Sequence, residues 1–321
     1  MQGNGFNQGN GFNHKESDRL LKMPGKLDRG PVEFNSRVAP HLGEIMEIAT
    51  TKVVSIPATM AIIGAAQTMT TYGFRRLPVT DPGTHRMLGI MTASDIISLF
   101  GGGDKQNLVT VKHGGNLLAA VNESVREIMS GHYFSLRTTD TIDDALELIL
   151  GKKIGGLPIV DGDEILRGIV TERDVLGLLG TGKSPLAVEE VMSTKLRVTA
   201  PDATIGAATR EMGRCRFRRL PVVSEDVLFG IITSTNIVRY LGTGEVFDQL
   251  VTGDVNEVMD LPVRTLMKGE LITTTPEVPI NAAARIMLER GIGALPVIED
   301  SRLIGLVTEF DLVRAFSEAK N

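Results

Sequence analysis

The sequence has few of the residues on which several classes of protein depend. Among its 321 residues are one cysteine (Cys215), five histidines and no tryptophan, and aromatic residues make up 4%. A single cysteine excludes an internal disulfide framework, and the scattered histidines lack metal-ligand spacing. A net charge of −5 with so few aromatic rings argues against a nucleic-acid surface, which needs clustered cations and stacking side chains.

Long apolar runs and a leader sequence are also missing. No uncharged apolar run approaches the roughly 20 residues that a membrane helix needs, and no signal peptide opens the chain. We therefore expect a protein of the reducing cytoplasm that binds neither membrane nor nucleic acid. Hydrophobic residues make up 42% and charged residues 23%, which is typical of a folded chain, and the length predicts two compact units.

The first residues differ from the rest in composition. Residues 2–7 read QGNGFN, and residues 8–13 repeat them letter for letter. Because such a Gly, Asn and Gln-rich segment has too little apolar surface to fold, we expect residues 1–37 to form a disordered head.

From about Val38 onward one pattern occurs four times in register. Each copy begins near a methionine and continues to a Leu-Pro pair, which starts at Leu77, Leu157, Leu220 and Leu295. Each copy closes with a glycine, a short apolar run and a Thr-x-x-Asp or Thr-x-x-Asn element, at residues 89–95, 168–174, 230–236 and 305–311. Four such agreements in order indicate a repeated structural unit.

The hydrophobic period changes within each copy. In the third, a β-branched run at 196–199 precedes a helical stretch at 205–212, two short apolar strands at 220–223 and 228–232, and a helix at 235–241. The pattern predicts an α/β fold of β-α-β-β-α units, each too small to bury both faces of its sheet alone. We expect repeats at 38–103, 124–182, 183–243 and 261–321, with linkers at 104–123 and 244–260.

The copies alternate in type. Copies one and three carry Phe-Arg-Arg before the Leu-Pro pair, whereas copies two and four carry Ile-Gly-Gly and Ile-Gly-Ala there. Longer connections lie within each pair, and the link between copies two and three is short. The repeat is therefore a duplicated pair, which predicts two tandem modules.

These residues resemble the CBS family, whose motif is a glycine, an apolar strand, Ser or Thr, two variable residues and Asp. The resemblance spans about Gly43 to Phe316. The pairs look like Bateman modules, and four copies together look like the disc formed by the γ subunit of AMP-activated protein kinase and its stand-alone archaeal relatives. The resemblance implies binding of AMP, ADP or ATP, or in some relatives S-adenosylmethionine, in clefts between paired repeats.

The Thr-x-x-Asp element supplies the first group of candidate ligand-binding residues. It joins a strand to a helix, whose first N–H groups suit a phosphate, and its carboxylate is a good acceptor for the two ribose hydroxyls. We assign ribose contacts to Asp95, Asp174, Asn236 and Asp311. We assign ribose or phosphate contacts to the threonines of the same elements, Thr92, Thr171, Thr233 and Thr308. The same element is also a capping box that starts the helix, and Asn236 lacks the charge.

In kinase γ relatives, basic residues before the Leu-Pro strand contact phosphates, which assigns that role here to Arg75, Arg76, Arg218 and Arg219. Surface ion pairing is the alternative, and strand alternation predicts that one arginine of each pair faces the cleft. Relatives also place a hydroxyl near the ligand at the end of the first strand, at the positions of Ser55, Thr199 and Thr274. Strand propensity alone also favours Thr there.

The best-supported interpretation is a non-catalytic sensor that binds adenine nucleotides without another cofactor and relays energy state to a protein partner or within a homodimer. The alternatives are an S-adenosylmethionine or other adenosine sensor, and an architectural dimer with vestigial sites. An enzyme with a CBS insert is disfavoured, because the repeats leave no residues for a catalytic barrel. Gly177 to Ser184 match a phosphate-loop expression, but they follow a helix and run into Pro185, so we expect a helix end and linker there.

Overall fold

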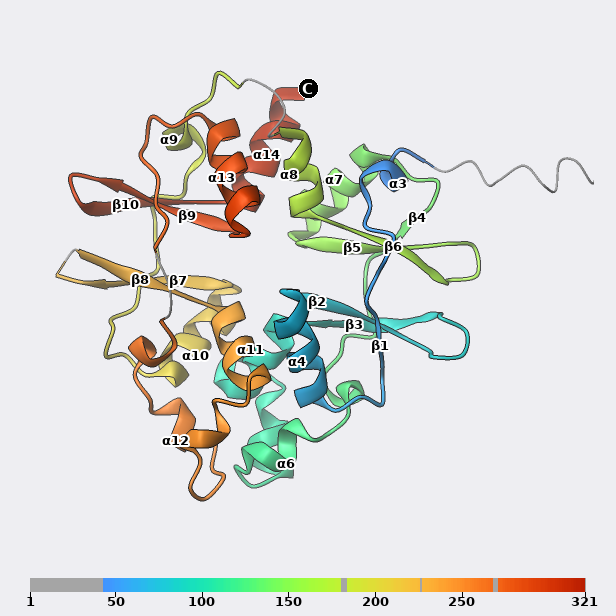
Figure 1. The fold of residues 1–321 in the computed structure, drawn as a ribbon, viewed down its shortest axis with the longest axis vertical. Coiled ribbons are helices and arrows are strands. Elements are labelled where there is room, and N and C mark those ends of the chain that lie inside the picture. The colour runs from blue at the N-terminus through green and yellow to red at the C-terminus, as the bar shows by residue number, and fades with distance from the viewer. Residues whose placement is uncertain (1–42, 180–183, 226, 268–270, 321) are drawn as a thin grey trace, which may run out of the picture. The chain divides into compact units, whose positions relative to one another are not determined.

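A computed structural model describes residues 43–179, 184–225, 227–267 and 271–320 (Figure 1). The predicted disordered head falls outside these residues. The described chain from Gly43 onward forms one compact unit, where the chain length predicted two. The reason is that both apolar cores run across the two halves of the sequence, as described below.

Each repeat consists of a helix, two antiparallel strands and a second helix. In repeat 1 these are α4 (Ile62–Tyr72), β2 (Arg76–Thr80), β3 (Met87–Thr92) and α5 (Ala93–Ile97). In repeat 2 they are α7 (Ile142–Lys152), β5 (Gly156–Val160), β6 (Leu166–Thr171) and α8 (Glu172–Leu179). In repeat 3 they are α10 (Ile205–Cys215), β7 (Arg219–Ser224), β8 (Val227–Thr233) and α11 (Ser234–Gly242). In repeat 4 they are α13 (Ile280–Arg290), β9 (Ala294–Glu299), β10 (Arg302–Thr308) and α14 (Glu309–Lys320).

Short elements precede or connect these units. They are α3 (Ile45–Ile48), β1 (Ile56–Pro57), η1 (Ser98–Gly102), η2 (Leu108–Lys112), α6 (Leu117–Val121), η3 (Val125–Glu127), β4 (Leu136–Arg137), α9 (Val188–Val191), η4 (Phe247–Gln249), α12 (Asn256–Met259) and η5 (Val263–Leu266). The predicted leading strand is short: β1 and β4 each pair in parallel with the following strand, and in repeats 3 and 4 it reduces to single bridges at Thr199 and Thr274. The predicted β-α-β-β-α order is confirmed.

Successive repeats exchange backbone hydrogen bonds and form the predicted modules. In the first module, Thr50 ahead of repeat 1 bridges Ile169 of repeat 2, and Ser130 ahead of repeat 2 bridges Ile90 of repeat 1. In the second module, Ser193 bridges Leu306, and β8 joins β10 in the sheet order β7-β8-β10-β9. The leading segment of one repeat thus completes its partner, which is why a single copy is not a closed unit.

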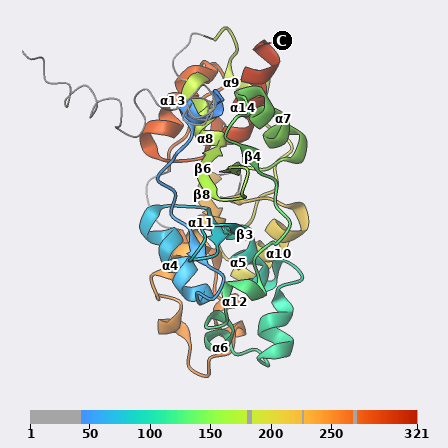
Figure 2. The same cartoon turned by 90° about the vertical axis from the view of Figure 1, so that its right-hand side faces the viewer.

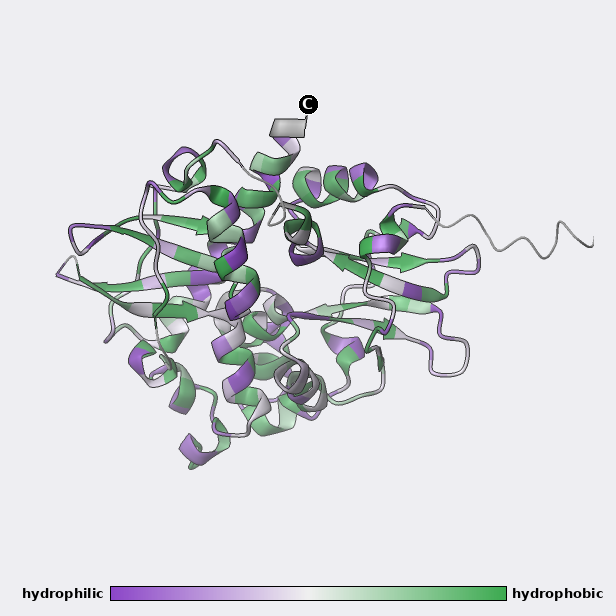
Figure 3. Cartoon of the chain, turned by 45° about the horizontal axis from the view of Figure 1, so that its top comes forward, coloured by the Kyte–Doolittle hydropathy of each residue, from purple (hydrophilic) through white to green (hydrophobic). Residues whose placement is uncertain are grey.

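The apolar cores join the modules. One core contains buried residues of α4, α5, α10 and α11 and so belongs to repeats 1 and 3, and the other belongs to repeats 2 and 4. Figure 1 shows the sheets in a central band with α4 and α11 below it and α13 and α8 above it, and Figure 2 shows the same layering from the side. Hydrophobic residues follow the strands, and hydrophilic ones gather at the outer ends of the hairpins (Figure 3).

Within the described residues, no helix is both long and apolar enough to span a membrane. The amphipathic helices instead bury one face in the shared cores, as Ala65, Ala66 and Met69 of α4 do. Because helices of both modules build each core, separating the modules would expose apolar surface from all four repeats.

Candidate functional site

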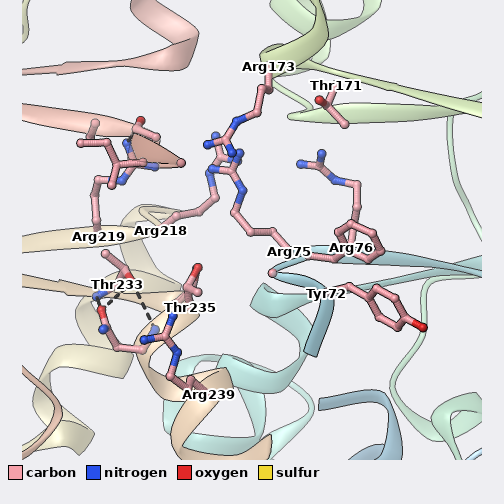
Figure 4. A pocket seen from close by; sticks show the side chains of 18 of the residues that line it. Tyr72, Arg75, Arg76, Thr171, Arg173, Arg218, Arg219, Thr233, Thr235 and Arg239 are labelled. Carbon is pink, nitrogen blue, oxygen red and sulfur yellow. Dashed lines mark hydrogen bonds between the residues drawn. The ribbon is translucent and has the colours of Figure 1, made fainter. Parts of the chain in front are cut away.

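Residues from all four repeats line one cavity of about 670 Å³. Among the described lining residues, one side chain carries a carboxylate, Asp174, and seven are cationic: Lys52, Arg75, Arg76, Arg173, Arg218, Arg219 and Arg239. Figure 4 shows Arg75, Arg173 and Arg218 converging from different elements on the middle of this space. The cavity is therefore suited to an anion.

The same local structure sets both arginine pairs. Helix α4 ends at Gly73, whose left-handed backbone (φ 69°) turns the chain back so that β2 begins at Arg76. Arg216 (φ 55°) ends α10 in the same way, and β7 begins at Arg219. Because Arg75 and Arg218 precede the strands, strand alternation does not apply to them. The prediction that one arginine of each pair faces the cleft was wrong, since all four line the cavity.

Two buried glutamates hold three of these arginines in ion pairs that cross between the modules. Glu309 Oε2 accepts from Arg75 Nη2 at 2.6 Å, and Glu309 Oε1 accepts from Arg173 Nη2 at 2.8 Å. Arg218 Nη2 donates to both carboxylate oxygens of Glu172 at 3.2 Å. The glutamate side chains are 1% exposed. Burial alone would raise the pKa of Glu309, but Arg75 and Arg173 outweigh it and hold that pKa below its ordinary value.

The remaining arginines of the pairs have no carboxylate hydrogen-bond partner among the described residues. Arg76 Nη1 donates to the carbonyl oxygen of Gly155 at 2.5 Å, and Arg219 Nη1 donates to that of Gly293 at 2.6 Å. Burial, and then the neighbouring arginines, lower the pKa of Arg76 and of Arg219 to about 10. Both guanidinium groups therefore stay charged at neutral pH, and an anion in the cavity would stabilise them.

The glycines of repeats 2 and 4 make room for these guanidinium groups. A Cβ on Gly155 would overlap Arg76 and approach Arg218 Nη1 to 2.7 Å, and one on Gly293 would lie 2.9 Å from Arg75 Nη1. The alternation between Arg-rich and Gly-rich copies thus has a steric reason, since each arginine pair needs small residues opposite it.

All four Thr-x-x-Asp or Thr-x-x-Asn elements form the predicted caps. In each, one side-chain oxygen accepts from both the backbone N–H and the hydroxyl of the threonine, as in the pair Asp174 and Thr171 at 2.7 Å. Asp174 lines the cavity, and its Oδ1 accepts no hydrogen bond from the described residues. Burial raises the pKa of Asp174 and of Asp311, because removing a carboxylate from water disfavours its charged form.

The cavity brings together some of the sequence-predicted residues and leaves others outside. Its lining includes Thr171, Asp174, Thr233, Asn236 and the four arginines of the pairs. Asp95 instead accepts from Lys105 Nζ at 2.7 Å, and that ammonium group also contacts the Ile128 carbonyl oxygen. Seven of the predicted site residues are not among the cavity's described lining residues: Ser55, Thr92, Asp95, Thr199, Thr274, Thr308 and Asp311.

Several of these outlying side chains have other contacts. Ser55 Oγ accepts from Thr80 at 3.1 Å, and Thr92 and Thr308 are held by the aspartates of their own caps. Thr274 Oγ1 is buried without a hydrogen-bond partner among the described residues. Their assignment to a ligand stays a prediction.

Sequence reasoning missed Glu172, Arg173, Glu309 and Arg239. A signal for the glutamates was present, because copies two and four read Thr-Glu-x-Asp where copies one and three read Thr-Ala and Thr-Ser. The glutamate therefore occurs in the copies that lack the arginine pair. Pairing across modules explains that pattern, but one copy gives no indication of it.

The phosphate-loop match does not have the local structure of such a loop. Gly177 lies inside helix α8 (Glu172–Leu179), whereas a phosphate loop follows a strand and precedes its helix. The match includes residues 180–183, which are outside the described chain. Among the described residues, no group of three or more His, Cys, Asp and Glu side chains could hold a metal ion.

Comparison with known proteins agrees with this architecture. The CBS domain model matches residues 45–102, 125–181, 188–243 and 263–318. The chain is 39% identical over 276 residues to the uncharacterized protein MJ1225 of Methanocaldococcus jannaschii, covering 85% of this chain and 99% of that protein. The crystal structure of MJ1225, described as a candidate archaeal homologue of γ-AMPK, superposes with a TM-score of 0.81.

Two further relatives cover nearly as much of the chain. A 33.4 kDa protein from the ribosomal RNA operon of Thermofilum pendens is 27% identical over 265 residues, which is 83% of this chain and 88% of that protein. A conserved protein of Pyrococcus horikoshii shares the fold, with a TM-score of 0.53 and 20% identity over 84% of this chain and 97% of that chain. With four matched domains covering most of its length, the chain belongs to the CBS-domain family and resembles the stand-alone archaeal relatives of the kinase γ subunit.

Proposed function

We propose that this protein is a non-catalytic regulatory sensor that binds adenine nucleotides in the central cavity. The observation that supports this proposal most is the cavity lining, whose described residues include seven cationic side chains and one carboxylate, Asp174. The free oxygen of Asp174 would accept hydrogen bonds from the ribose hydroxyls, and the arginines would bind the phosphates. The similarity to MJ1225, described as a candidate homologue of γ-AMPK, supports the same ligand class.

The ion pairs between modules suggest how binding is relayed. Arg75 and Arg173 pair with Glu309, and Arg218 pairs with Glu172, so each pair joins one module to the other. A phosphate in the cavity competes with these carboxylates for the same guanidinium groups. Ligands with more phosphates loosen more of these pairs, which gives ATP and AMP different effects on the relative orientation of the modules. A protein partner or a second copy of the chain would read that difference.

Isothermal titration calorimetry of the full chain with AMP, ADP, ATP, S-adenosylmethionine and tripolyphosphate tests the proposal. We expect ATP to bind more tightly than AMP, tripolyphosphate to compete with ATP, and S-adenosylmethionine to bind weakly because its sulfonium and ammonium groups face the same arginines. The variant Arg219→Gln lowers ATP affinity about 10-fold or more. The control Arg86→Gln, at an exposed position outside the cavity lining, leaves it unchanged.

Two results would overturn the proposal. If no adenine nucleotide binds more tightly than about 1 mM, the repeats are architectural and the cavity is not a nucleotide site. If S-adenosylmethionine binds more tightly than every nucleotide, the protein is an S-adenosylmethionine sensor and not a sensor of adenine nucleotides.

A further inference from the structure

The cavity contains two equivalent caps with opposite hydrogen-bonding character. Asp174 is the third residue of α8 in the first module and Asn236 is the third residue of α11 in the second, and both residues line the cavity. Asp174 Oδ2 accepts from Thr171 N and Oγ1 at 2.7 Å, and Asn236 Oδ1 accepts from Thr233 N at 2.8 Å and from Thr233 Oγ1 at 2.6 Å. The backbone therefore presents the two side chains in the same way.

The atoms left for a ligand differ. At Asp174 the remaining atom is a carboxylate oxygen, which accepts hydrogen bonds from hydroxyl groups. At Asn236 the remaining atom is Nδ2, because a backbone N–H can donate only to the amide oxygen and so fixes the amide orientation. Because an amide NH₂ group donates hydrogen bonds, Asn236 offers a ligand a donor where Asp174 offers an acceptor.

A cation reinforces this change one helical turn later. Arg239 follows Asn236 by three residues on α11, is exposed, and lines the cavity. Figure 4 shows its side chain beside Thr233 and Thr235, below the group of central arginines. No hydrogen bond or ion pair of the Arg239 guanidinium occurs among the described residues. The equivalent residue of repeat 2 is Gly177.

Repeat 4 shows why the charge at Arg239 is available to a ligand. Arg314 stands at the equivalent position of α14, but there it lies 3.8 Å from the carboxylate of its own cap, Asp311. In repeat 3 the cap is neutral, so Arg239 has no such carboxylate. The two hydroxyl groups of a ribose would find no carboxylate here to accept their hydrogen bonds. A phosphate would accept hydrogen bonds from both the Asn236 amide and the Arg239 guanidinium group.

We propose that the cleft at Asn236 and Arg239 binds a nucleotide whose ribose carries a phosphate at the 2′ or 3′ position, in place of the free ribose diol taken at Asp174. The proposal rests on the proposed function, because it assumes that the adenosine ribose lies at these caps and that the 5′-phosphates meet the central arginines. The clefts at Asp174 and at Asn236 then bind different nucleotides. The sensor responds to a nucleotide phosphorylated both at the 5′ position and at the 2′ or 3′ position, besides AMP, ADP or ATP.

Calorimetry of the full chain with AMP, adenosine 2′,5′-bisphosphate and adenosine 3′,5′-bisphosphate tests the inference. We expect one of the bisphosphates to bind about 10-fold more tightly than AMP at one site, and the comparison of the two identifies the phosphorylated position. The variant Arg239→Gln removes that advantage, a loss of about 10-fold or more, since one charge-assisted contact is lost. The matched control Arg314→Gln keeps it.

A double variant makes the test reciprocal. Asn236→Asp combined with Arg239→Ser gives this cleft the cap of repeat 1, Thr-x-x-Asp followed by serine at the third position. It should lose the bisphosphate site and gain an AMP site, with its fold checked by thermal unfolding. If AMP binds to the wild type but neither bisphosphate exceeds it, or if the advantage persists in Arg239→Gln, the inference is wrong and the proposed function stands. If no nucleotide binds at all, the proposed function is wrong and the inference falls with it.

Discussion

We predict that Glu309 stabilises the folded chain and competes with a bound nucleotide for the arginines of the cavity. Its carboxylate is 1% exposed and accepts from Arg75 at 2.6 Å and from Arg173 Nη2 and Nε at 2.8 and 3.0 Å. The variant Glu309→Gln keeps the shape of the side chain and removes its charge. Breaking a buried ion pair from one side costs about 3–5 kcal/mol. Because the side chain of Arg173 is 37% exposed and partly hydrated, we expect the lower end of that range, about 3 kcal/mol.

The same variant should bind ATP more tightly. In the wild type a triphosphate must displace Glu309 from two guanidinium groups, and in Glu309→Gln those groups are already free of the carboxylate. A charge-assisted hydrogen bond contributes about 1.5–3 kcal/mol, so ATP affinity should rise by a factor of about 10 or more. Saturating ATP then restores part of the lost stability, because each tenfold gain in affinity adds about 1.4 kcal/mol of stabilisation at the same excess ligand concentration.

The pH dependence of unfolding gives an independent check on Glu309. Its pKa is lower in the folded chain than its ordinary value, so the stabilisation is present above the ordinary pKa of a glutamate. It is lost as the pH falls through the lowered pKa of the folded state. Glu309→Gln should therefore differ most from the wild type at neutral pH, and the two curves should converge on the acid side.

Chemical denaturation across this pH range, with and without ATP, measures both effects. Glu277→Gln is the control, because Glu277 is an exposed glutamate of the same repeat outside the cavity lining. A Glu309→Gln protein as stable as the wild type, or one that binds ATP no more tightly, would refute the idea that this carboxylate holds the arginines against the ligand.

Three further variants test the caps, the glycines and the helix end. Asp174→Asn should lower AMP affinity about 10-fold or more, as measured by calorimetry. It should also raise the melting temperature at pH 7, because burial raises the pKa of Asp174 and so makes its charged form unfavourable there. The control is Asp144→Asn in the exposed cap of α7. Gly155→Ala should displace the guanidinium groups of the cavity, destabilise the folded chain by about 1–3 kcal/mol and weaken ATP binding, as measured by denaturation and calorimetry. The control Gly162→Ala should change neither stability nor ATP affinity, because a Cβ there meets nothing within 4 Å. Gly177→Ala should stabilise α8 by about 0.5–1 kcal/mol in denaturant titrations without changing ATP affinity, an outcome that a functional phosphate loop would not allow.

Much of the fold followed from the sequence because its signals are local and repeated. The period change in each copy predicted β-α-β-β-α, and the structure has the α-β-β-α part of that order in all four repeats, preceded by a short strand in repeats 1 and 2 and by a single bridge in repeats 3 and 4. The capping interactions at Thr171 and Asp174 were also predictable, since residue type and spacing within one turn determine them. The leading strand was overestimated: it has two residues in repeat 2, as β4 (Leu136–Arg137), and is a single bridge in repeats 3 and 4.

The site was predicted in part. The sequence identified the arginine pairs and Asp174, because each belongs to a motif that recurs between copies. Sequence reasoning passed over Arg239, because an arginine on the exposed face of a helix, as repeat 4 also has at Arg314, does not by itself indicate a ligand. Arg239 becomes a candidate ligand-binding residue only when the structure shows that it lines the cavity and that its neighbouring cap, Asn236, is neutral.

Local patterns in the sequence were enough to predict the repeated unit, its pairing into two modules and the residue types of the caps, because these depend on contacts within one copy or between successive copies. The folded chain alone reveals that Glu309 of repeat 4 pairs with Arg75 of repeat 1, and that repeats 1 and 3 share an apolar core. The first of these contacts joins residues 234 positions apart, and the second joins helices of different modules. They depend on how the amphipathic helices of one module bury their faces against the other, and no local pattern encodes that arrangement.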